Sequence, residues 1–389
     1  MKKIYTCIDI GTDTIRILVS EYYGKKFRTL AVSSVRSKGI KRGVIVDESL
    51  VLERLKLALD DISSRINIPI KKAVITIPAY NAECTLVHGN VPIVNEEKMV
   101  TEKDILRVQN SVVNDILPNM ELVSVTPIDF TIYENGSEIE TLKDPKNKIC
   151  DRLGIRAMMV CVPKTSVVSF AKVVEKSGVE VVDLVLSPIA DFEEVKTEEL
   201  ESGMTAIINI GKTITTVSMF NKGIITNTSV LKIGSKIIDD DISYIYYTTK
   251  KAARKAKENF GIAHPRYANK NETYEVRDVN GKLVRINQYE LSKVINKRLV
   301  EILNVAKNEL KVLTNKQIRY IMVLGGITDM PGMPGLNFVL EDVFGNNAKT
   351  YTINTLGIRK ARFITISGAI KHFVKKIKLR GKEYSMFSS

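Results

Sequence analysis

The stretch "IDIGTDTIRI", residues 8–17, returns in the second half of the chain as "INIGKTITTV", residues 208–217. Both copies keep an Ile-x-Ile-Gly core, and the acid Asp9 of the first copy is replaced by its amide, Asn209, in the second. In each copy one apolar run enters the glycine corner and another leaves it, which is the pattern of a β-hairpin. The repeat therefore predicts two related halves, each built around one hairpin corner.

The composition and charge of the chain restrict its class. At 389 residues it is long enough for two sizeable domains, and its apolar and charged fractions, 44% and 26%, are those of ordinary globular proteins. The sequence contains no run of about eighteen apolar residues, so it predicts no membrane-spanning helix. The opening "MKKIYTCIDIG" is typical of a first β-strand and not of a signal peptide. The net charge of +14 favours nucleotides, anionic lipid or acidic proteins as partners, or else reflects a Lys-rich surface that only maintains solubility.

The cysteine and histidine residues form no recognisable binding pattern. They are scattered along the chain without a Cys-x-x-Cys pair: Cys7, Cys84, Cys150 and Cys161, and His88, His264 and His372. We therefore expect neither a zinc site nor a disulfide framework, and a reducing cytoplasm as the compartment.

The spacing of apolar residues predicts the main elements next to the first corner. Asp47 is expected to cap a helix whose apolar residues recur at helical spacing as far as Ile62. Residues 71–78 predict a strand, and residues 165–178 a short amphipathic helix that leads into another strand at 179–188. After the second corner the pattern predicts the same hairpin followed by a third strand.

Two segments interrupt this pattern. Residues 83–161 hold short predicted strands, polar loops and a helix with a Thr101-x-x-Asp104 cap pattern, and we interpret them as an inserted α+β module. Residues 241–311 are Lys-rich and end in a long helix with one apolar face. After it, "RYIMVLGGITDMPGM" (319–333) predicts a buried strand, a Gly-Gly turn and the start of another helix.

A glycine at a hairpin corner lets successive backbone N–H groups point at one place, which makes a site for an anion. Glycine is required there because a Cβ atom would keep a phosphate away. One such corner is usually structural. Two matching corners, followed by a strand, a Gly-Gly turn and a helix, favour phosphate binding.

Three segments, in this order, resemble a known superfamily. "CIDIGTDTIRI" (7–17), "INIGKTITT" (208–216) and "MVLGGITDMPG" (322–332) are similar to the phosphate-1, phosphate-2 and adenosine segments of the actin/Hsp70/sugar-kinase superfamily. Within it the chain resembles the bacterial cell-division family FtsA, most specifically in "SKGIKRGVIVD" (37–47). Further similar stretches are "TEKDILRV", "SVTPIDFTI" and "VEKSGVEVVDLVLSPIADFEEV".

The resemblance implies an α/β, actin-like fold of two lobes and four subdomains around a central cleft. The implied boundaries are residues 1–82, 162–200 and 348–378 for subdomain 1A; 83–161 for 1C, the α+β insertion of the FtsA type; 201–240 and 312–347 for 2A; and 241–311 for 2B. Residues 379–389 would begin a C-terminal tail, and we expect the chain to stop before the membrane anchor of that tail.

The resemblance also implies a site for ATP and Mg²⁺ in the cleft. The residues that match the family's nucleotide-binding motifs are Gly11, Thr12, Asp13 and Thr14 from one half, and Gly211, Lys212, Thr213, Gly234, Lys257, Gly325 and Gly326 from the other. Asp9 would act on the hydrated Mg²⁺ through water, as a hard oxygen ligand.

The second corner departs from the family pattern, which is roughly Asp-x-Gly-Gly-Gly-Thr-Thr-Asp. Both acids and two of the three glycines are absent here: Asn209 replaces one acid, and Lys212 adds a positive charge where a phosphate would lie. An amide cannot accept a proton or hold a cation as a carboxylate does. Arg254 replaces a family Glu and Ile327 a family Gly. We therefore expect nucleotide binding without efficient hydrolysis.

The long helix before residue 312 is similar to the family helix that binds the C-terminal tail of the tubulin homologue FtsZ. Arg298 and Glu301 lie on its polar side and are the candidates for contacts with that tail, in which Arg298 would pair bidentately with a carboxylate. An ordinary solvated helix face is the alternative.

The expected function is that of a division-site scaffold. It would polymerise as an actin-like filament, tether FtsZ filaments to the inner face of the cytoplasmic membrane, and bind other division proteins through the inserted subdomain, with no nucleic-acid partner. Two alternatives share the fold: a pilus-assembly adaptor like PilM, which binds a peptide of a membrane protein, and a kinase or chaperone ATPase of the superfamily.

Overall fold

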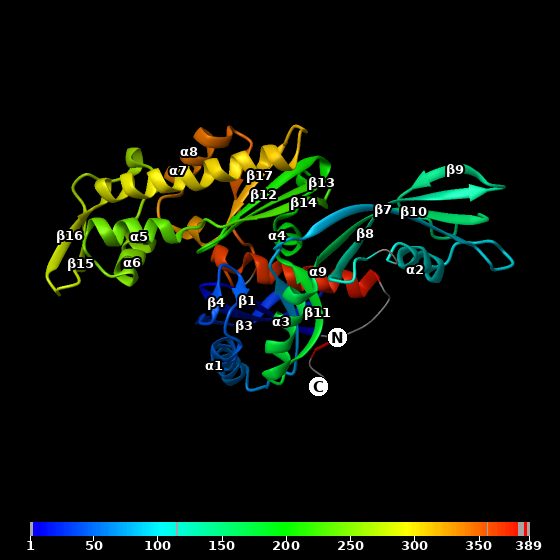
Figure 1. Cartoon of the computed structure of the whole chain (residues 1–389), viewed down its shortest axis with the longest axis horizontal. Helices are drawn as coiled ribbons and strands as arrows, with labels where there is room; N and C mark the ends of the chain where they lie inside the picture. The colour runs from blue at the N-terminus through cyan, green and yellow to red at the C-terminus, as the bar shows by residue number, and fades with distance from the viewer. Residues whose placement is uncertain (1–2, 114–115, 356, 380–384, 387–389) are drawn as a thin grey trace.

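The protein is described from a computed structural model that places residues 3–113, 116–355, 357–379 and 385–386. Two five-stranded sheets of the same topology form its centre (Figure 1). The first has the order β11-β6-β1-β2-β3 and the second the order β14-β13-β12-β17-β18. In each sheet three antiparallel strands precede two parallel ones, so the predicted repeat is confirmed as a repeat of whole sheets.

The strands of the two sheets correspond one to one. Those of the first are β1 (Lys3–Ile10), β2 (Thr14–Tyr23), β3 (Lys26–Arg36), β6 (Lys72–Ile77) and β11 (Glu180–Leu186). Those of the second are β12 (Met204–Ile210), β13 (Thr215–Asn221), β14 (Ile224–Leu231), β17 (Tyr320–Leu324) and β18 (Ala348–Thr350). The short pair β4 (Ile40–Lys41) and β5 (Val44–Ile45) follows β3.

Helices cover both sheets and join them. In the first lobe α1 (Glu48–Ile66) begins at Asp47, whose Oδ1 accepts from the N–H groups of Ser49 and Leu50, so the predicted cap is confirmed. The helices α3 (Lys164–Lys176), α4 (Ser187–Val195) and α9 (Ile364–Leu379) complete this lobe. Figure 1 shows α4 and α9 between the two sheets. Their apolar side chains share one core with both lobes; for example, Phe192 of α4 stacks on Phe220 of β13 with ring centroids 4.4 Å apart.

The second lobe carries an arm that projects away from its sheet. The arm consists of α5 (Lys236–Ile245), α6 (Lys250–Phe260), the hairpin β15 (Thr273–Arg277) and β16 (Leu283–Asn287), and much of α7 (Gln288–Leu313). The predicted apolar face of the long helix is confirmed, since Leu291, Ile295, Leu299 and Ile302 are fully buried. The helix α8 (Met333–Phe344) packs against α7.

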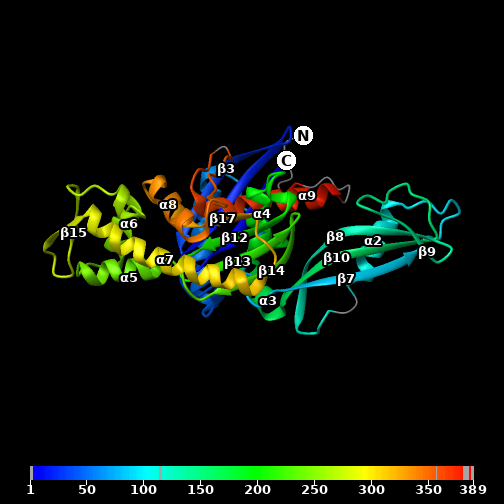
Figure 2. The same cartoon turned by 90° about the horizontal axis from the view of Figure 1, so that it is seen from above.

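The inserted module is a four-stranded antiparallel sheet with its own small core. It contains β7 (Glu83–Pro92), α2 (Glu102–Ser111), β8 (Met120–Glu134), β9 (Ser137–Leu142) and β10 (Arg152–Pro163), and the predicted capping box at the start of α2 is present. It projects at the end of the molecule opposite the arm (Figures 1 and 2). The prediction of short strands was wrong for two of them. β8 has 15 residues and β10 has 12, because both run from the module back to the first lobe, where they contact α3.

The two ends of the chain meet at the first sheet. The N–H of Met386 donates to the carbonyl oxygen of Ile4, and the Met386 side chain is buried in the core of the first lobe. Of the predicted tail at 379–389, residues 380–384 and 387–389 lie outside the described residues. Within the part that is described, no helix has the length and apolar character needed to cross a membrane.

Candidate functional site

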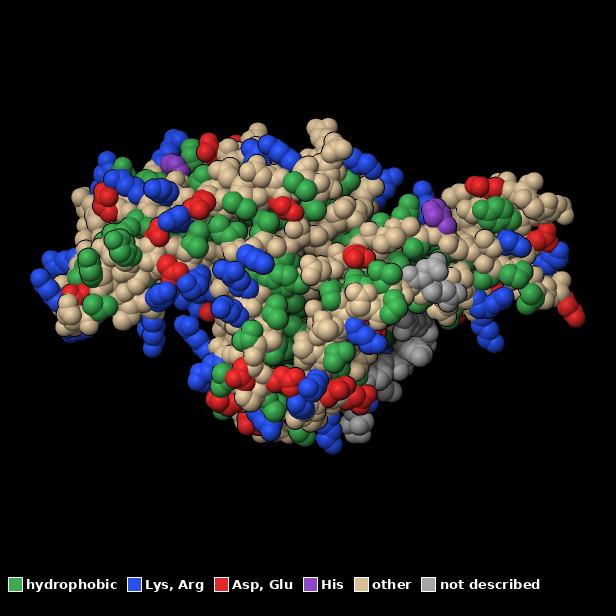
Figure 3. Space-filling model, in the orientation of Figure 1, with side chains coloured by type: hydrophobic (Ala, Val, Ile, Leu, Met, Phe, Trp, Pro, Cys, Tyr) green, Lys and Arg blue, Asp and Glu red, His purple; other side chains and the backbone are tan. Residues whose placement is uncertain are grey.

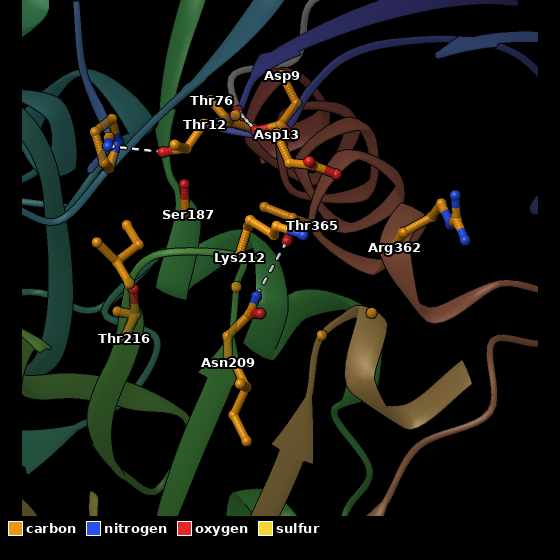
Figure 4. Close-up of a pocket in the computed structure, with 18 of the residues that line it drawn as sticks. Asp9, Thr12, Asp13, Thr76, Ser187, Asn209, Lys212, Thr216, Arg362 and Thr365 are labelled. Atoms are coloured by element: carbon orange, nitrogen blue, oxygen red, sulfur yellow. Dashed lines mark hydrogen bonds between the residues drawn. The ribbon is translucent and has the colours of Figure 1, made fainter. Parts of the chain in front are cut away.

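A pocket lies between the two lobes, where the two hairpin corners face each other (Figure 4). The empty space in it is about 910 Å³, counting the part open to solvent. Eight of the predicted site residues line it: Asp9, Gly11, Thr12, Asp13, Gly211, Lys212, Gly325 and Gly326. Four others do not: Thr14, Thr213, Gly234 and Lys257.

The two corners have the same backbone geometry. The N–H of Gly11 donates to the carbonyl oxygen of Thr14 (3.1 Å), and the N–H of Gly211 donates to that of Ile214 (2.9 Å). A Cβ atom at either glycine would lie only 3.0 or 2.9 Å from the same carbonyl oxygen. Glycine is therefore required by the tightness of the turn itself, before any ligand is considered.

Asp9 is held by its neighbours in the first sheet. Its Oδ1 accepts from the hydroxyl of Thr76 (2.6 Å) and its Oδ2 from Nη1 of Arg16 (2.9 Å). Arg16 lies directly opposite Asp9 in the β1–β2 ladder, so the ion pair follows from the register of the hairpin. Sequence reasoning missed Arg16, although its place across the hairpin was a usable signal.

Asp13 connects the first corner to the arm of the other lobe. Its Oδ1 accepts from Nη1 of Arg254 on α6 (2.8 Å), and Nη1 of Arg36 lies 4.0 Å from the same oxygen. Burial alone would raise the pKa of Asp13, but the positive charges of Arg254, Lys212 and Arg36 hold it below its usual value. Arg254 also donates to Glu258, one turn further along α6 (2.7 Å).

Asn209, the amide that replaces an acid, uses its NH₂ group as a donor to a buried carboxyl group. Its Nδ2 donates to Oδ2 of Asp191 (2.7 Å), and the hydroxyl of Thr365 donates to Oδ1 of the same carboxyl (2.5 Å). Asp191 is 1% exposed. Burial raises its pKa to about 6, although the two hydrogen bonds act in the opposite direction and the charge of Asp9 adds to the rise. Sequence reasoning missed Asp191 as well, although it lies in one of the family-like stretches.

Lys212 is fixed at the second corner by a buried carboxylate. Its Nζ pairs with Asp239 of α5, and Nζ of Lys257 lies 2.6 Å from the other oxygen of the same group. Asp239 is 2% exposed and Lys257 is 4% exposed, and burial lowers the pKa of Lys257. Gly234 packs closely against the backbone of this corner. A Cβ atom at Gly234 would lie only 2.7 Å from the carbonyl oxygens of both Gly211 and Lys212.

Further lining residues come from the Gly-Gly turn, from the start of α4, from the turn η4 and from β13. Gly325, with φ of +106°, precedes the short helix η3 (Gly326–Asp329). Ser187 lines the pocket at the start of α4, and its hydroxyl donates to the carbonyl oxygen of Ile77 (2.9 Å). Two more of the side chains labelled in Figure 4 are Arg362, from the turn η4 (Ala361–Phe363), and Thr216, opposite Asn209 in the β12–β13 ladder.

The charges of the pocket fit a nucleotide's phosphates. Three cationic and two anionic side chains line it: Arg16, Lys212 and Arg362, and Asp9 and Asp13. The donor set does not fit Mg²⁺. Both oxygens of Asp9 already accept, one of them from a guanidinium, and Asp13 is paired with Arg254. Within the described residues no group of three His, Cys, Asp or Glu side chains could hold a metal ion.

Arg298 and Glu301, the predicted partner-binding residues, lie on α7 of the arm and not in the pocket. Arg298 is bound bidentately to Asp241 of α5 (2.6 and 3.2 Å) and also donates to Glu301 (2.6 Å). The next turn of α5 and the residues after it expose two aromatic side chains, Tyr244 (81%) and Tyr247 (72%). The sequence analysis did not identify these two exposed aromatic side chains.

Two lobes of one topology that close on a shared pocket define an actin-like protein, and the solved structures that the chain resembles have this fold. One is a PilM–PilN type IV pilus biogenesis complex, with a TM-score of 0.59, 16% identity, and coverage of 94% of this chain and 98% of that chain. Another is MreB5 of Spiroplasma citri bound to ADP, with a TM-score of 0.57, 15% identity, and coverage of 98% and 99%.

The sequence defines a narrower group. The family described as "Cell division protein FtsA" matches residues 206–368. The chain is 30% identical to cell division protein FtsA of Enterococcus hirae over 373 residues, which cover 95% of this chain and 83% of that protein. The chain therefore belongs to the FtsA family of cell division proteins.

Proposed function

We propose that this chain is an actin-like scaffold of the division site. It polymerises, tethers FtsZ filaments to the inner face of the cytoplasmic membrane, and binds a nucleotide between its lobes with weak or no hydrolysis. In this proposal the sheet and helix of residues 83–161 form subdomain 1C and bind other division proteins, and residues 241–311 form subdomain 2B. Membership of the FtsA family supports the division role.

The pairing of the pocket's acids carries the proposal that hydrolysis is lost. A general base must be free to accept a proton from the attacking water. Asp9 faces Arg16, Asp13 faces Arg254, and Asp191 is buried under two hydrogen-bond donors. We therefore expect phosphate release from ATP to stay far below ~1 s⁻¹, the low end of typical enzymes. Turnover at or above that rate would favour the alternative of a kinase or chaperone ATPase.

The ion pairs of Arg298 with Asp241 and Glu301 on the arm support the proposal that this surface binds the FtsZ tail. A carboxylate of the tail can compete with Asp241 for the guanidinium of Arg298, which is 33% exposed. Tyr244 and Tyr247, which follow Asp241 in the chain, offer exposed apolar area. The test is fluorescence anisotropy with a labelled peptide of the FtsZ C-terminal tail. Arg298→Gln should weaken binding about tenfold, as for loss of one charge-assisted pair.

A matched control is available on the neighbouring hairpin. Arg285 is also paired with an acid, Glu275, but is 70% exposed and lies on β16, so Arg285→Gln should leave the affinity unchanged.

Retention of a peptide from a pilus-type membrane protein, with no retention of the FtsZ tail, would favour the PilM-like adaptor instead. Filament formation is tested separately by sedimentation and electron microscopy, and a chain that stays monomeric at high concentration would contradict the polymerisation part.

A further inference from the structure

We propose that the pocket binds the polyphosphate of a nucleotide without a divalent cation, and that Lys212 supplies positive charge in its place. This inference rests on the proposed nucleotide site and adds that the nucleotide binds there as the metal-free anion and not as its Mg²⁺ complex. It follows from the disagreement between the residues present and the needs of Mg²⁺.

The oxygen atoms that would position a hydrated Mg²⁺ are engaged with the protein's own donors. Asp9 accepts from Arg16 and Thr76, and both side chains of the Asp9–Arg16 pair are mostly buried, with 13% and 20% exposed. At the equivalent position of the second corner, Asn209 donates its NH₂ group to Asp191. Mg²⁺ needs oxygen ligands in near-octahedral geometry and gives up its water reluctantly. A Mg²⁺ ion that bound Oδ2 of Asp9 directly would have to displace a guanidinium.

The second corner instead carries a fixed cation. Lys212 lines the pocket and its Nζ is held by Asp239, which is also paired with Lys257. One carboxylate shared by two ammonium groups compensates only one of them, and Asp13, on which the charge of Lys212 also acts, is already paired with Arg254. Because Asp239 is almost fully buried, water screens the charges of this cluster poorly on the protein side. A phosphate beside Lys212 would neutralise the second ammonium charge.

The surroundings of the pocket add to the same charge. Figure 3 shows Lys and Arg side chains gathered where the arm that carries α6 faces the lobe that carries β4. These two segments border the pocket, since α6 carries Arg254, which reaches Asp13, and the loop of β4 and β5 carries Gly43, which lines it. The exposed cations on them are Lys250, Lys251 and Lys255, and Arg36, Lys38, Lys41 and Arg42. We call these exposed cations the rim of the pocket. The rim attracts a free polyphosphate more strongly than its Mg²⁺ complex, because the complex carries less negative charge.

The experiment is isothermal titration of the whole chain with ADP and with ATP, once in EDTA and once in excess Mg²⁺. We expect the Kd in EDTA to be equal to or lower than the Kd in Mg²⁺. Binding that is at least about tenfold tighter with Mg²⁺, a difference of about 1.4 kcal/mol, would overturn the inference and leave the proposed nucleotide site intact. Absence of binding in both buffers would overturn the nucleotide site together with the inference.

Two variants distinguish a phosphate contact from structural support. Lys212→Gln keeps Asp239 paired with Lys257 and should weaken binding in EDTA about tenfold, as for loss of one charge-assisted contact. Mg²⁺ should then recover part of the loss. The control Lys255→Gln, at an exposed position of the same rim, should change the Kd much less. If Lys212→Gln loses the same affinity in both buffers, or none, Lys212 does not replace a metal ion.

Lys212→Gln must also be shown to fold, by circular dichroism and its unfolding temperature. As a positive test, the double variant Asn209→Asp, Lys212→Gly restores an acid and removes the competing cation. It should bind nucleotide more tightly in Mg²⁺ than in EDTA, and a double variant that remains indifferent to Mg²⁺ would contradict the assignment.

Discussion

Asp191 is a residue whose burial makes the stability of the protein depend on pH. Its folded-state pKa is about 6, against an ordinary value of 3.8, because the carboxyl is buried beside the pocket. Between these two values the folded state binds more protons than the unfolded state. The contribution of Asp191 to the unfolding free energy therefore falls as pH rises from about 4 to about 6, and it is constant above. The total fall is roughly 3 kcal/mol at about 1.4 kcal/mol per unit.

The measurement is urea unfolding of the wild type and of Asp191→Asn between pH 4 and pH 8. The asparagine can still accept from Asn209, and the hydroxyl of Thr365 can reverse its hydrogen bond, so the variant keeps the site but does not titrate. The stability of the wild type relative to the variant should decline through this interval. The exposed Asp60→Asn on α1 serves as control, and a flat difference for Asp191→Asn would show that its pKa is not raised.

At the scale of single residues, the sequence predicted the backbone of the candidate site better than its charges. Gly11 and Gly211 were identifiable because a tight turn imposes glycine at a fixed place in a local pattern. Arg254 was noticed only as a departure, and its partner Asp13 lies 241 residues away in the chain. Such pairs depend on how the lobes pack, which no local pattern encodes.

At the scale of elements, the turn after β17 is fixed by its contact with the end of β12. Gly325 has φ of +106°, and a Cβ there would lie 2.2 Å from the carbonyl oxygen of Ile210. Gly325→Ala should therefore lower the unfolding free energy by more than about 2 kcal/mol, through backbone strain and the forced displacement of β12. At the adjacent Gly326 the φ angle is not positive, and a Cβ would meet no atom of the described residues within 4 Å.

Gly326→Ala is consequently a matched control, and its cost should stay below about 1 kcal/mol. Chemical unfolding measures the loss of unfolding free energy for each variant, and nucleotide titration shows whether the change also affects binding. Equal losses for the two alanine variants would mean that the contact between the turn and β12 does not limit the fold.

Elements with a strong local pattern were predicted from the sequence, and those without one were not. The cap and apolar face of α1 and the buried face of α7 followed from residue types at helical spacing. The third strand of the second sheet, β14, was predicted, but its counterpart β3 was not. β3 lies at the edge of its sheet and is exposed at many positions, so its apolar alternation is weak.

At the scale of the whole molecule, contacts of several kinds hold the lobes together. One is the apolar core that α4 and α9 share with both sheets, on one side of the pocket. Another is the hydrogen bond of Asn209 to Asp191 of α4. A third is the pair of Arg254 with Asp13, which reaches across from the arm of one lobe to the corner of the other. Both side chains of the pair are mostly buried, with 17% and 14% exposed. The protein therefore has its own ionic link between the lobes, in the region where we place the ligand.

Loss of this link should let the lobes separate. Arg254→Asp puts two carboxylates opposite each other, and we expect a larger radius of gyration by small-angle X-ray scattering and a loss of about 1–3 kcal/mol in unfolding free energy. The exchange Asp13→Arg, Arg254→Asp restores opposite charges and should recover most of the compactness. Lys255→Asp, one position along α6 but exposed, controls for the change in net charge. If Arg254→Asp scatters like the wild type, the other contacts between the lobes, chiefly the shared core of α4 and α9, set the distance between them. In that case the ion pair is a local contact without influence on closure.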